Sequence, residues 1–531
     1  MVNLQKTMDK YRFILYNLER NNKMKKMISS LMLIAVILSS TFAFATSLEN
    51  NIHSDEHKVG ESVQVNEPYE KFGWSKEEYE KRLKNEDSND MATKLRSSFP
   101  RKKVIINDVV TLETAYPDDY AGAYIDENNV LHIKTVGTKS QQLYKAVINT
   151  PVAEFEEKLK SFNDAMFVDG IEKSGLQAQS FASSSEKGTK EKGKLENGIQ
   201  LEDFDAKEVD KIVFETAEYS YNYLLYIQSV LDEVMIKYNI TSQGVDESIN
   251  RLEITLKDIK GKDDIVSYLT KSIKDFDEKS LFFIESDSEM KNMYGTEPTV
   301  YNAVPGSCAY STNQGGDAFL PSTISFTAYR ASTGQYGMVS CGHGNTAGRV
   351  MLNSIYSELG TVALWSQGQQ SGSITDIDAS FTPFNRGYGT SSCLYGSTYL
   401  NDKHYDITSV YMSTDAITQG GNAVDKYGAK TGHTSGTIAN VNVTSNNKDN
   451  NTGIVVTVTN QIRVKMYSEG GDSGGPLVRI AVKQSEQARP SVILEGTLNA
   501  GNGTYTCFTK AYRILGQWGL TLMTGSSYNY K

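Results

Sequence analysis

Short runs of β-branched and aromatic residues recur between residues 308 and 500, separated by clusters of Gly, Asn, Ser and Thr at hairpin spacing. Runs of this length, bounded by turn residues, are typical of strands. The strand candidates are Thr323–Tyr329, Thr361–Trp365, Ala379–Phe381, Thr437–Val443, Ile454–Val458, Ile462–Met466, Pro476–Val482 and Val492–Leu498. In this part of the chain, helical spacing is convincing only at Tyr512–Trp518. Regular strands with little helix predict an all-β barrel or sandwich.

The region before residue 303 has a mixed pattern of strands and helices. Residues 46–100 are polar, so we expect them to be mostly loose, with a helix near Lys76–Leu83. Residues 174–198 are rich in Ser, Lys, Glu and Gly and are typical of a linker. Strands are expected at Val104–Ile106, Ala121–Ile125, Leu131–Ile133 and Asn250–Leu256, and helices at Val152–Phe162, 206–236 and Asp263–Phe276.

Charge divides the chain at the same place. Residues 303–531 hold 15 of the 54 Lys+Arg and 13 of the 64 Asp+Glu, which leaves 39 and 51 for residues 1–302. The net charge is therefore +2 in the second part and −12 in the first. An acidic total argues against a nucleic-acid-binding protein. The four Cys lack the paired spacing of a metal site, so neither a metal nor another cofactor is expected.

The beginning of the chain has the pattern of a secretory signal. Lysines at 23, 25 and 26 precede an apolar run over 28–45, and Ala43 and Ala45 are the small residues that a signal peptidase reads. We expect cleavage after Ala45 and export of the product, in which disulfides are possible. A retained membrane anchor is the alternative, but the apolar run is short for a span. Either Met1 or Met24 could be the start.

The strongest chemical signal is the run Glu-Gly-Gly-Asp-Ser-Gly-Gly-Pro-Leu at residues 469–477. A serine hydroxyl becomes an effective nucleophile only with a base within hydrogen-bond reach and donors aimed at the developing oxyanion. The flanking glycines let the backbone approach a substrate carbonyl. We therefore predict Ser473 as the nucleophile, with the N–H groups of Gly471 and Ser473 as the oxyanion hole.

The positions of the histidines decide between two serine-hydrolase arrangements. The run Gly471-x-Ser473-x-Gly475 also fits the nucleophile elbow of α/β-hydrolases, which requires a His after the Ser. His433 is the last His of the chain, so that arrangement is excluded and the order His, Asp, Ser remains. The predicted base is His343, which ends an apolar run and has small neighbours.

The acid should follow His343 and come from a buried strand. Residues 374–381, Ile-Thr-Asp-Ile-Asp-Ala-Ser-Phe, are the best such segment. Asp376 and Asp378 have the same parity, so strand alternation cannot choose between them. Asp317 precedes His343 and would give the subtilisin order, but it lies in a polar Gly-Gly loop.

Several blocks of the second part match one family in chain order. They are Ala303–Gly306 with Ala309–Ser311, Gly337–His343, Asp378–Phe381, Lys426–Gly436, the Ser473 run and the tail Ile514–Leu522. Through these blocks, residues 303–531 resemble the bacterial branch of the chymotrypsin-like serine peptidases, the streptogrisin and α-lytic protease relatives. The resemblance selects Asp378 over Asp376 and gives His433 a structural role. It implies two six-stranded antiparallel barrels with a C-terminal helix, and substrate contacts at Ser468, Gly470, Asn499, Ala500 and Gly501.

The resemblance extends upstream. Those peptidases are made with a pro-region that assists folding and inhibits the enzyme, and Ala121–Asn129 and Gly244–Ile254 resemble the strand-and-turn patterns of its subdomains. An α+β pro-region is therefore expected here. The predicted divisions are 1–45 signal peptide with an N-terminal extension, 46–103 flexible polar segment, 104–169 first pro-region subdomain, 170–205 linker, 206–300 second pro-region subdomain and 301–531 serine peptidase domain.

The chain departs from the family at several positions. Cys341 lies two residues before His343, where the family has Cys directly after the His, and the expected partner position holds Ser322. The pairing of the four Cys is therefore open among three possibilities. The serine that supports the catalytic Asp is replaced by Asn499, which can still donate a hydrogen bond, so we expect weaker tuning and retained activity.

Together these features predict a secreted bacterial serine endopeptidase made as a zymogen. Its partners would be protein or peptide substrates and its own pro-region, without nucleic acid, and it would be a monomer. The residue six before Ser473 is Tyr467 and not Asp, so an apolar or aromatic residue is expected before the cut, with Glu469 as a rim charge. The alternatives are a non-catalytic binding protein on a peptidase scaffold, or residues 46–300 as a separate surface-binding module. The natural substrate and the processing site stay open.

Overall fold

The structure is a computed structural model that describes residues 69–151, 154–155, 167–173, 212–292, 308–385, 397–484 and 490–524, apart from short gaps within these ranges. The predicted signal peptide, most of the linker and the boundary near residue 300 lie outside the described residues. Among the described helices, none is long and apolar enough to cross a membrane.

Six antiparallel strands of the C-terminal half close into a barrel. They follow each other in space as β22-β25-β26-β27-β24-β23, and β23 pairs back with β22. Val424, Ile438, Ile462, Leu477 and Phe508 pack together inside it. The strands are β22 Gln419–Gly428, β23 Gly432–Lys448, β24 Val455–Lys465, β25 Pro476–Ile480, β26 Ser491–Gly501 and β27 Tyr505–Lys510.

Other strands of this half form a four-stranded sheet, β12-β11-β15-β16, and a five-stranded sheet, β17-β19-β14-β13-β28, of which β28 follows the barrel strands in the chain. They are β11 Cys308–Asn313, β12 Gly316–Thr323, β13 Phe326–Arg330, β14 Gln335–Ser340, β15 Val350–Leu352, β16 Glu358–Thr361, β17 Leu364–Ser366, β19 Ala379–Pro383 and β28 Leu520–Leu522, with the short strands β18 Ile374–Thr375, β20 Ser397–Leu400 and β21 Lys403–Val410 beside the barrel. Helix α7, Ala511–Trp518, lies between β27 and β28. The predicted all-β class with a C-terminal helix is confirmed, and one closed six-stranded antiparallel barrel is present, as expected.

The upstream part mixes helices with strands, as predicted. Its helices are α2 Lys76–Ser97, α3 Gln141–Asn149, α5 Tyr221–Asp232 and α6 Lys262–Ser272. Its strands are β1 Arg101–Ile106, β2 Val109–Thr114, β3 Tyr120–Ile125, β4 Leu131–Thr135, β5 Phe167–Lys173, β6 Ile212–Thr216, β7 Ile240–Asp246, β8 Arg251–Leu256, β9 Leu281–Glu285 and β10 Met290–Asn292. One apolar cluster, with Leu131, Leu224 and Ile254 at its centre, joins the α2–α3 and α5–α6 portions.

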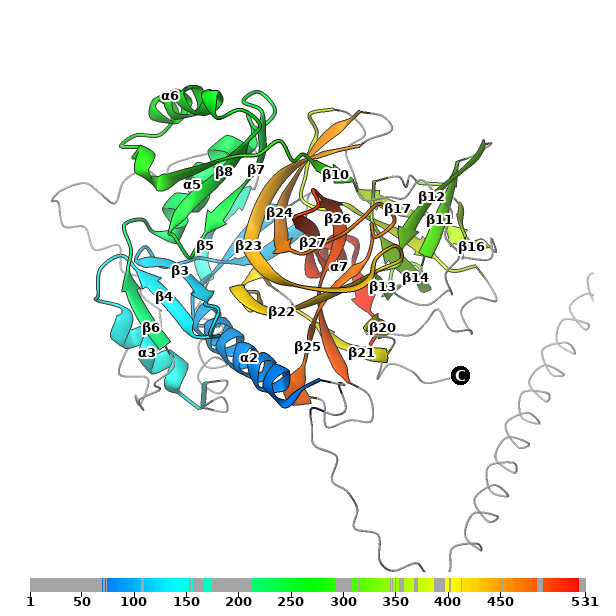
Figure 1. Cartoon of the computed structure of the whole chain (residues 1–531), viewed down its shortest axis with the longest axis horizontal. Coiled ribbons are helices and arrows are strands. Elements are labelled where there is room, and N and C mark those ends of the chain that lie inside the picture. Colours follow the sequence, from blue (N-terminus) through cyan, green and yellow to red (C-terminus); the bar gives the residue numbers. More distant parts are fainter. Residues whose placement is uncertain are drawn as a thin grey trace, which may run out of the picture. The chain divides into compact units, whose positions relative to one another are not determined.

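Upstream strands continue the sheet of the C-terminal barrel. Strand β7 pairs antiparallel with β23, with Gly244 opposite Val443, and β3 pairs with β22. Figure 1 shows β7 and β8 beside the long strand β23. A third upstream strand, β10, pairs with both β23 and β26. Backbone hydrogen bonds thus join the two parts that composition separates.

Helix α2 begins where a helix was predicted, near Lys76–Leu83, but it runs over 22 residues to Ser97, where a mostly loose segment was expected. Its buried face is polar. Arg82 forms an ion pair with Asp425 of the barrel at 2.7 Å, and Arg96 donates to the carbonyl oxygen of Ile417 at 2.9 Å. Since most of its buried residues are polar and only Ala92 and Leu95 are apolar, the helix lacks the hydrophobic periodicity by which an amphipathic helix is predicted.

The helix predicted over residues 206–236 is also only partly correct. Residues 212–216 form strand β6, which pairs in parallel with β4, and the helix α5 begins later. Its N-terminus is set by Ser220, whose side chain accepts a hydrogen bond from the Tyr223 N–H at 3.2 Å, the usual role of Ser at an N-cap.

Two of the four cysteines are free thiols. Cys341 and Cys507 are both buried and unpaired, while the side chains of Cys308 and Cys393 lie outside the described residues. Any disulfide that includes Cys341 or Cys507 is therefore absent, and this removes all three pairings of four cysteines. At the position expected for a partner of Cys341, Ser322 accepts a hydrogen bond from Ser340 Oγ at 3.4 Å.

Candidate active site

Ser473 lies in the turn that leads into β25, and glycine makes this turn possible. Gly474 has a φ of +86°, and a Cβ there would lie 2.0 Å from the Thr323 carbonyl oxygen. Only glycine adopts such a conformation without strain. The Gly474 N–H donates to the Leu498 carbonyl of β26 at 2.7 Å. The turn is thus tied to β26 directly beside Ser473.

Asp472, the residue before Ser473, anchors this turn through a buried network of hydrogen bonds and an ion pair. The sequence pattern gave no indication of this role. The Asp472 carboxylate accepts hydrogen bonds from the N–H groups of Lys430 and Thr431, both at 3.0 Å. Lys426 Nζ forms a buried ion pair with it at 3.1 Å. The Lys426–Gly436 block, which the resemblance matched, therefore wraps the loop that carries Ser473.

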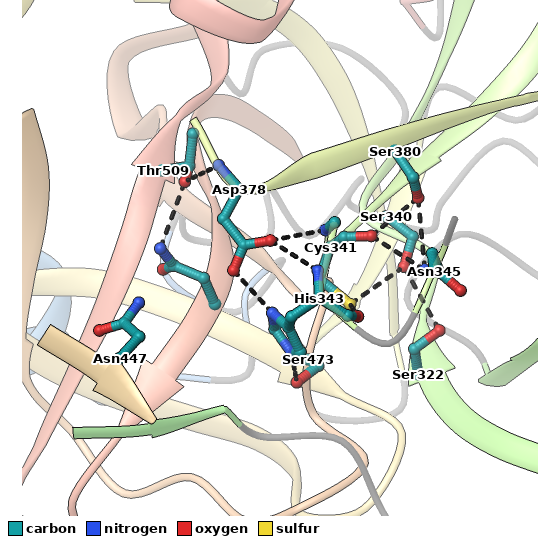
Figure 2. A network of polar contacts seen from close by, with 12 residues as sticks. Ser322, Ser340, Cys341, His343, Asn345, Asp378, Ser380, Asn447, Ser473 and Thr509 are labelled. Carbon is teal, nitrogen blue, oxygen red and sulfur yellow. Dashed lines mark hydrogen bonds and ion pairs between the residues drawn. The ribbon is translucent and has the colours of Figure 1, made fainter. Parts of the chain in front are cut away.

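His343 bridges the two residues predicted to act with it. Its Nε2 lies 2.6 Å from Ser473 Oγ, and its Nδ1 lies 2.6 Å from Asp378 Oδ2. Figure 2 shows the three side chains joined by these contacts. They come from the end of β14, the start of β19 and the turn before β25. The structure thus brings all three together from distant parts of the chain.

The Asp378 carboxylate is fixed by the backbone of the loop that contains Gly342 and His343, here called the histidine loop. Its Oδ1 accepts from the N–H groups of Gly342 and His343 at 2.8 and 2.7 Å, which leaves Oδ2 to face the imidazole. A Cβ on Gly342 would lie 2.7 Å from this carboxylate. Asp376, the other candidate acid, instead faces Arg513 at 3.4 Å.

Further polar side chains hold the histidine loop from behind (Figure 2). Ser380 Oγ and Asn345 Nδ2 both donate to the Cys341 carbonyl, at 2.7 and 2.9 Å. Ser340 Oγ donates to the Thr323 carbonyl at 2.8 Å. Because this loop supplies both His343 and the N–H donors to Asp378, these contacts fix the relative position of base and acid.

The site is closed to solvent. His343 is 1% exposed, and Asp378 and Ser473 are each 0% exposed. Burial is the largest single effect and lowers the pKa of His343, but the Asp378 carboxylate and Cys341 together outweigh it, so the pKa lies well above the ordinary value. An imidazole between a carboxylate and a serine hydroxyl can accept the hydroxyl proton and hold the resulting charge.

The residues predicted to contact substrate lie around this site. Ser468 is buried, and its Oγ lies 2.8 Å from Thr506 Oγ1 of β27. Asn499, Ala500 and Gly501 end strand β26. Asn499 Nδ2 donates to Gln461 Oε1 at 2.7 Å and to Thr509 Oγ1 at 3.3 Å, so its observed partners are not the Asp378 carboxylate.

A cavity of about 440 Å³ opens beside these residues. One side is formed by Ser468, Glu469 and residues 501–503, and the other by the upstream residues Lys257, Asp287, Ser288, Glu289 and Lys291. Glu469 lines this cavity, where it contacts the hydroxyl of the exposed Tyr467. Gly470, between Glu469 and Gly471, is partly exposed.

His433, to which the resemblance gave a structural role, lies beside a buried carboxylate. His433 Nε2 lies 2.9 Å from Asp425, the carboxylate that pairs with Arg82. In the described part of the chain, no group of three or more His, Cys, Asp and Glu is placed to hold a metal ion.

Comparisons with known proteins give solved structures only, since no family model and no curated protein matches the chain. The structures include Thermobifida fusca protease A (24% identity, TM-score 0.31), a Cellulomonas bogoriensis chymotrypsin (23%, 0.30) and a Nocardiopsis protease (22%, 0.31). Each match covers 42% of this chain and 100% of the other. Over that share, the chain is similar in structure to bacterial chymotrypsin-like serine proteases.

Proposed function

We propose that the chain is the precursor of a secreted serine endopeptidase, with residues 301–531 as the catalytic domain. The observation that carries the proposal is the line of two 2.6 Å contacts from Ser473 Oγ through His343 to Asp378. A serine hydroxyl, a histidine held in one orientation and a buried carboxylate form the constellation that recurs in serine hydrolases of unrelated folds.

In the proposed reaction, Ser473 Oγ attacks the carbonyl carbon of the scissile peptide bond. His343 Nε2 takes the hydroxyl proton and then passes it to the leaving amine, while Asp378 stabilises the imidazolium. The N–H groups of Gly471 and Ser473 stabilise the oxyanion. Water then hydrolyses the acyl-enzyme by the reverse sequence of proton transfers. No cofactor is needed for these steps.

We further propose that residues 104–300 are a pro-region that assists folding and inhibits the site. The nearly complete burial of His343 and Ser473 and the pairing of β10 with Ala500 and Gly501 support this, because both features deny access to an external substrate. The extracellular location rests on the signal-like residues 28–45 alone. Glu469 in the cavity wall is a reason to test basic as well as apolar residues before the cut.

The experiment compares purified wild-type chain with Ser473→Ala. The proposal expects covalent labelling of wild type by a fluorophosphonate probe and peptide hydrolysis after the upstream part is released, both absent in Ser473→Ala with unchanged folding. A binding protein on a peptidase scaffold would show neither reaction in wild type. An active enzyme that keeps residues 104–300 attached would instead favour a separate surface-binding module.

A further inference from the structure

A tryptophan side chain from a separate strand contacts the histidine loop. Trp365 belongs to β17, and its indole Nε1–H donates a hydrogen bond to the Gly342 carbonyl at 2.7 Å. The same carbonyl accepts a second hydrogen bond from the Asn345 N–H at 3.0 Å. Because Gly342 precedes His343 in the chain, both donors act on the peptide group that leads directly into the proposed base.

The Gly342 carbonyl and the His343 N–H belong to one peptide group. A peptide group is planar and trans, so its C=O and N–H point in opposite directions and turn together. On the N–H side, His343 donates to Asp378 Oδ1 at 2.7 Å (Figure 2). Trp365 and Asp378 therefore hold the two ends of the same peptide group, and an unbroken line of hydrogen bonds runs from the indole to the carboxylate.

This line bears on both the strength and the direction of the contact to Asp378. Hydrogen bonds in a chain polarise one another, so a donor at the Gly342 carbonyl makes the His343 N–H a stronger donor. The N–H bonds to Oδ1 leave Oδ2 to face His343 Nδ1 at 2.6 Å. Rotation of the Gly342–His343 peptide group would weaken its bond to Oδ1 and turn Oδ2 away from the imidazole.

Trp365 is itself held by a strand and by apolar packing, so its hydrogen bond is not what places the ring. Strand β17 pairs with β19, with Trp365 opposite Ser380 and Ser366 opposite Ala379. A Cβ on Gly342 would lie 2.7 Å from the Ser366 carbonyl oxygen, so β17 lies against the loop backbone. The indole packs on an apolar cluster that consists of Ile324, Met338, Met351, Leu359 and Val362.

We propose that Trp365 is a positioning residue for peptide hydrolysis, which acts through the Gly342–His343 peptide group to hold Asp378 toward the imidazole. This inference rests on the function proposed above. The contact between acid and base matters most when His343 has taken the serine proton, because the carboxylate then stabilises the imidazolium. Loss of the indole N–H should therefore slow the chemical step and leave substrate binding unchanged.

The experiment removes the indole N–H and keeps the ring. Trp365→benzothienylalanine replaces the N–H by sulfur, and Trp365→Phe is the closest natural substitution. Because the Gly342 carbonyl keeps its Asn345 donor, the loss is that of one net hydrogen bond. The kcat of the matured enzyme should thus fall about 2- to 12-fold in both variants with KM unchanged. Trp518→Phe, the same change in helix α7, is the control and should keep the wild-type kcat.

The pH–rate profile separates positioning from packing. If Asp378 is held less well, it raises the pKa of His343 less, so the acid limb of kcat/KM should move to lower pH in both Trp365 variants. A fall in kcat with an unmoved acid limb overturns the inference. A fall in Trp365→Phe alone overturns it too, because the ring and not its N–H then matters.

Two further outcomes separate this inference from the function on which it rests. Wild-type kinetics in both Trp365 variants overturn the positioning role, while the proposed function stands. A wild-type chain that neither hydrolyses peptides nor reacts with a fluorophosphonate removes the proposed function itself.

A spectroscopic measurement needs no active enzyme. In the Ser473→Ala precursor with His343 protonated, the proton between His343 Nδ1 and Asp378 Oδ2 should give a strongly downfield proton resonance, since hydrogen bonds between charged groups are short and strong. Trp365→benzothienylalanine should shift this resonance upfield, and Trp518→Phe should leave it in place. An unchanged resonance in the Trp365 variant overturns the inference even if that variant does not mature.

Discussion

The main-chain N–H of Asp378 donates to the hydroxyl of Thr509 at 3.1 Å, across 131 residues of sequence. Thr509 Oγ1 also accepts from Asn499 Nδ2 at 3.3 Å, and that amide donates to Gln461 at 2.7 Å. In the family that the chain resembles, the residue at position 499 supports the acid of the triad. Here Asn499 contacts Asp378 only indirectly, through Thr509. It acts on the main chain of Asp378 and not on its carboxylate.

Replacement of Thr509 should therefore impair catalysis. Thr509→Val keeps the shape but leaves the buried Asp378 N–H without an acceptor, at a cost of about 1–3 kcal/mol. If this cost falls on the transition state, kcat/KM drops by roughly 5- to 150-fold, while Thr509→Ser stays near wild type. The acid limb of the pH–rate profile should also move to lower pH as Asp378 shifts from His343. If Thr509→Val lowers thermal stability but leaves the acid limb of the pH–rate profile unchanged, Thr509 has only a structural role.

The pH dependence follows from the raised pKa of His343. Only the neutral imidazole can act as base, so kcat/KM should rise with pH through a midpoint above 6.5, the ordinary value. Asp378→Asn removes the charge that raises the pKa, so the midpoint should fall below that of wild type and kcat by about 10⁴-fold. The profile of the matured enzyme measures both. An acid limb that is unchanged in Asp378→Asn would contradict the pairing of Asp378 with His343.

The same shift affects stability with a definite sign. A raised pKa means that the folded state binds the His343 proton more tightly than the unfolded chain does. This contribution is complete below about pH 6.5 and is lost as pH rises through the higher folded-state pKa. Urea unfolding of the Ser473→Ala precursor across this window, compared with Asp378→Asn in the same background, isolates the contribution.

The sequence singles out Ser473, His343 and Asp378, and the structure brings these three side chains into contact. The turn that carries Ser473 needs glycine at 474, and the chain order of His and Ser excludes the α/β-hydrolase arrangement. Strand alternation could not separate Asp376 from Asp378, because both lie in the connection between β18 and β19. The N–H groups of Gly342 and His343 donate to Asp378.

What the sequence could not predict depends on partners far along the chain. Helix α2 buries Arg82 and Arg96 against a barrel more than 300 residues later, so its pattern resembles that of a solvated segment. Asn499 was expected to face the acid, and nothing in its neighbours indicates Gln461 instead. The register of β10 on β26 likewise follows from the folded topology, which no local pattern contains.

Loss of the Arg82 ion pair should destabilise the precursor strongly. The Asp425 carboxylate is fully buried, and the adjacent Arg82 guanidinium counteracts its burial and holds its pKa below the ordinary value. Arg82→Met leaves that charge without its main partner, at a cost of about 3–5 kcal/mol. Urea unfolding in the Ser473→Ala background measures it. Lys76→Gln, which removes an exposed pair with Glu80 at 3.9 Å, is the control and should change stability by less than about 0.5 kcal/mol. Equal effects would mean that the buried pair does not hold α2 to the barrel.

The thiol of Cys507 should be inert in the folded precursor. Burial raises its pKa to about 12, and the side chain packs under Met290 with Val443 and Ala500. Since the thiolate is the reactive form, iodoacetamide at pH 8 should leave Cys507 unmodified in the folded Ser473→Ala chain and modify it fully in urea. Peptide mass mapping distinguishes it from the other cysteines.

Because Met290 covers this thiol, Met290→Ala should make Cys507 react measurably faster, whereas Met235→Ala, a buried change in the upstream cluster away from β26, should not. Equal protection of Cys507 in both variants would show that Met290 of β10 does not shield this thiol from the reagent.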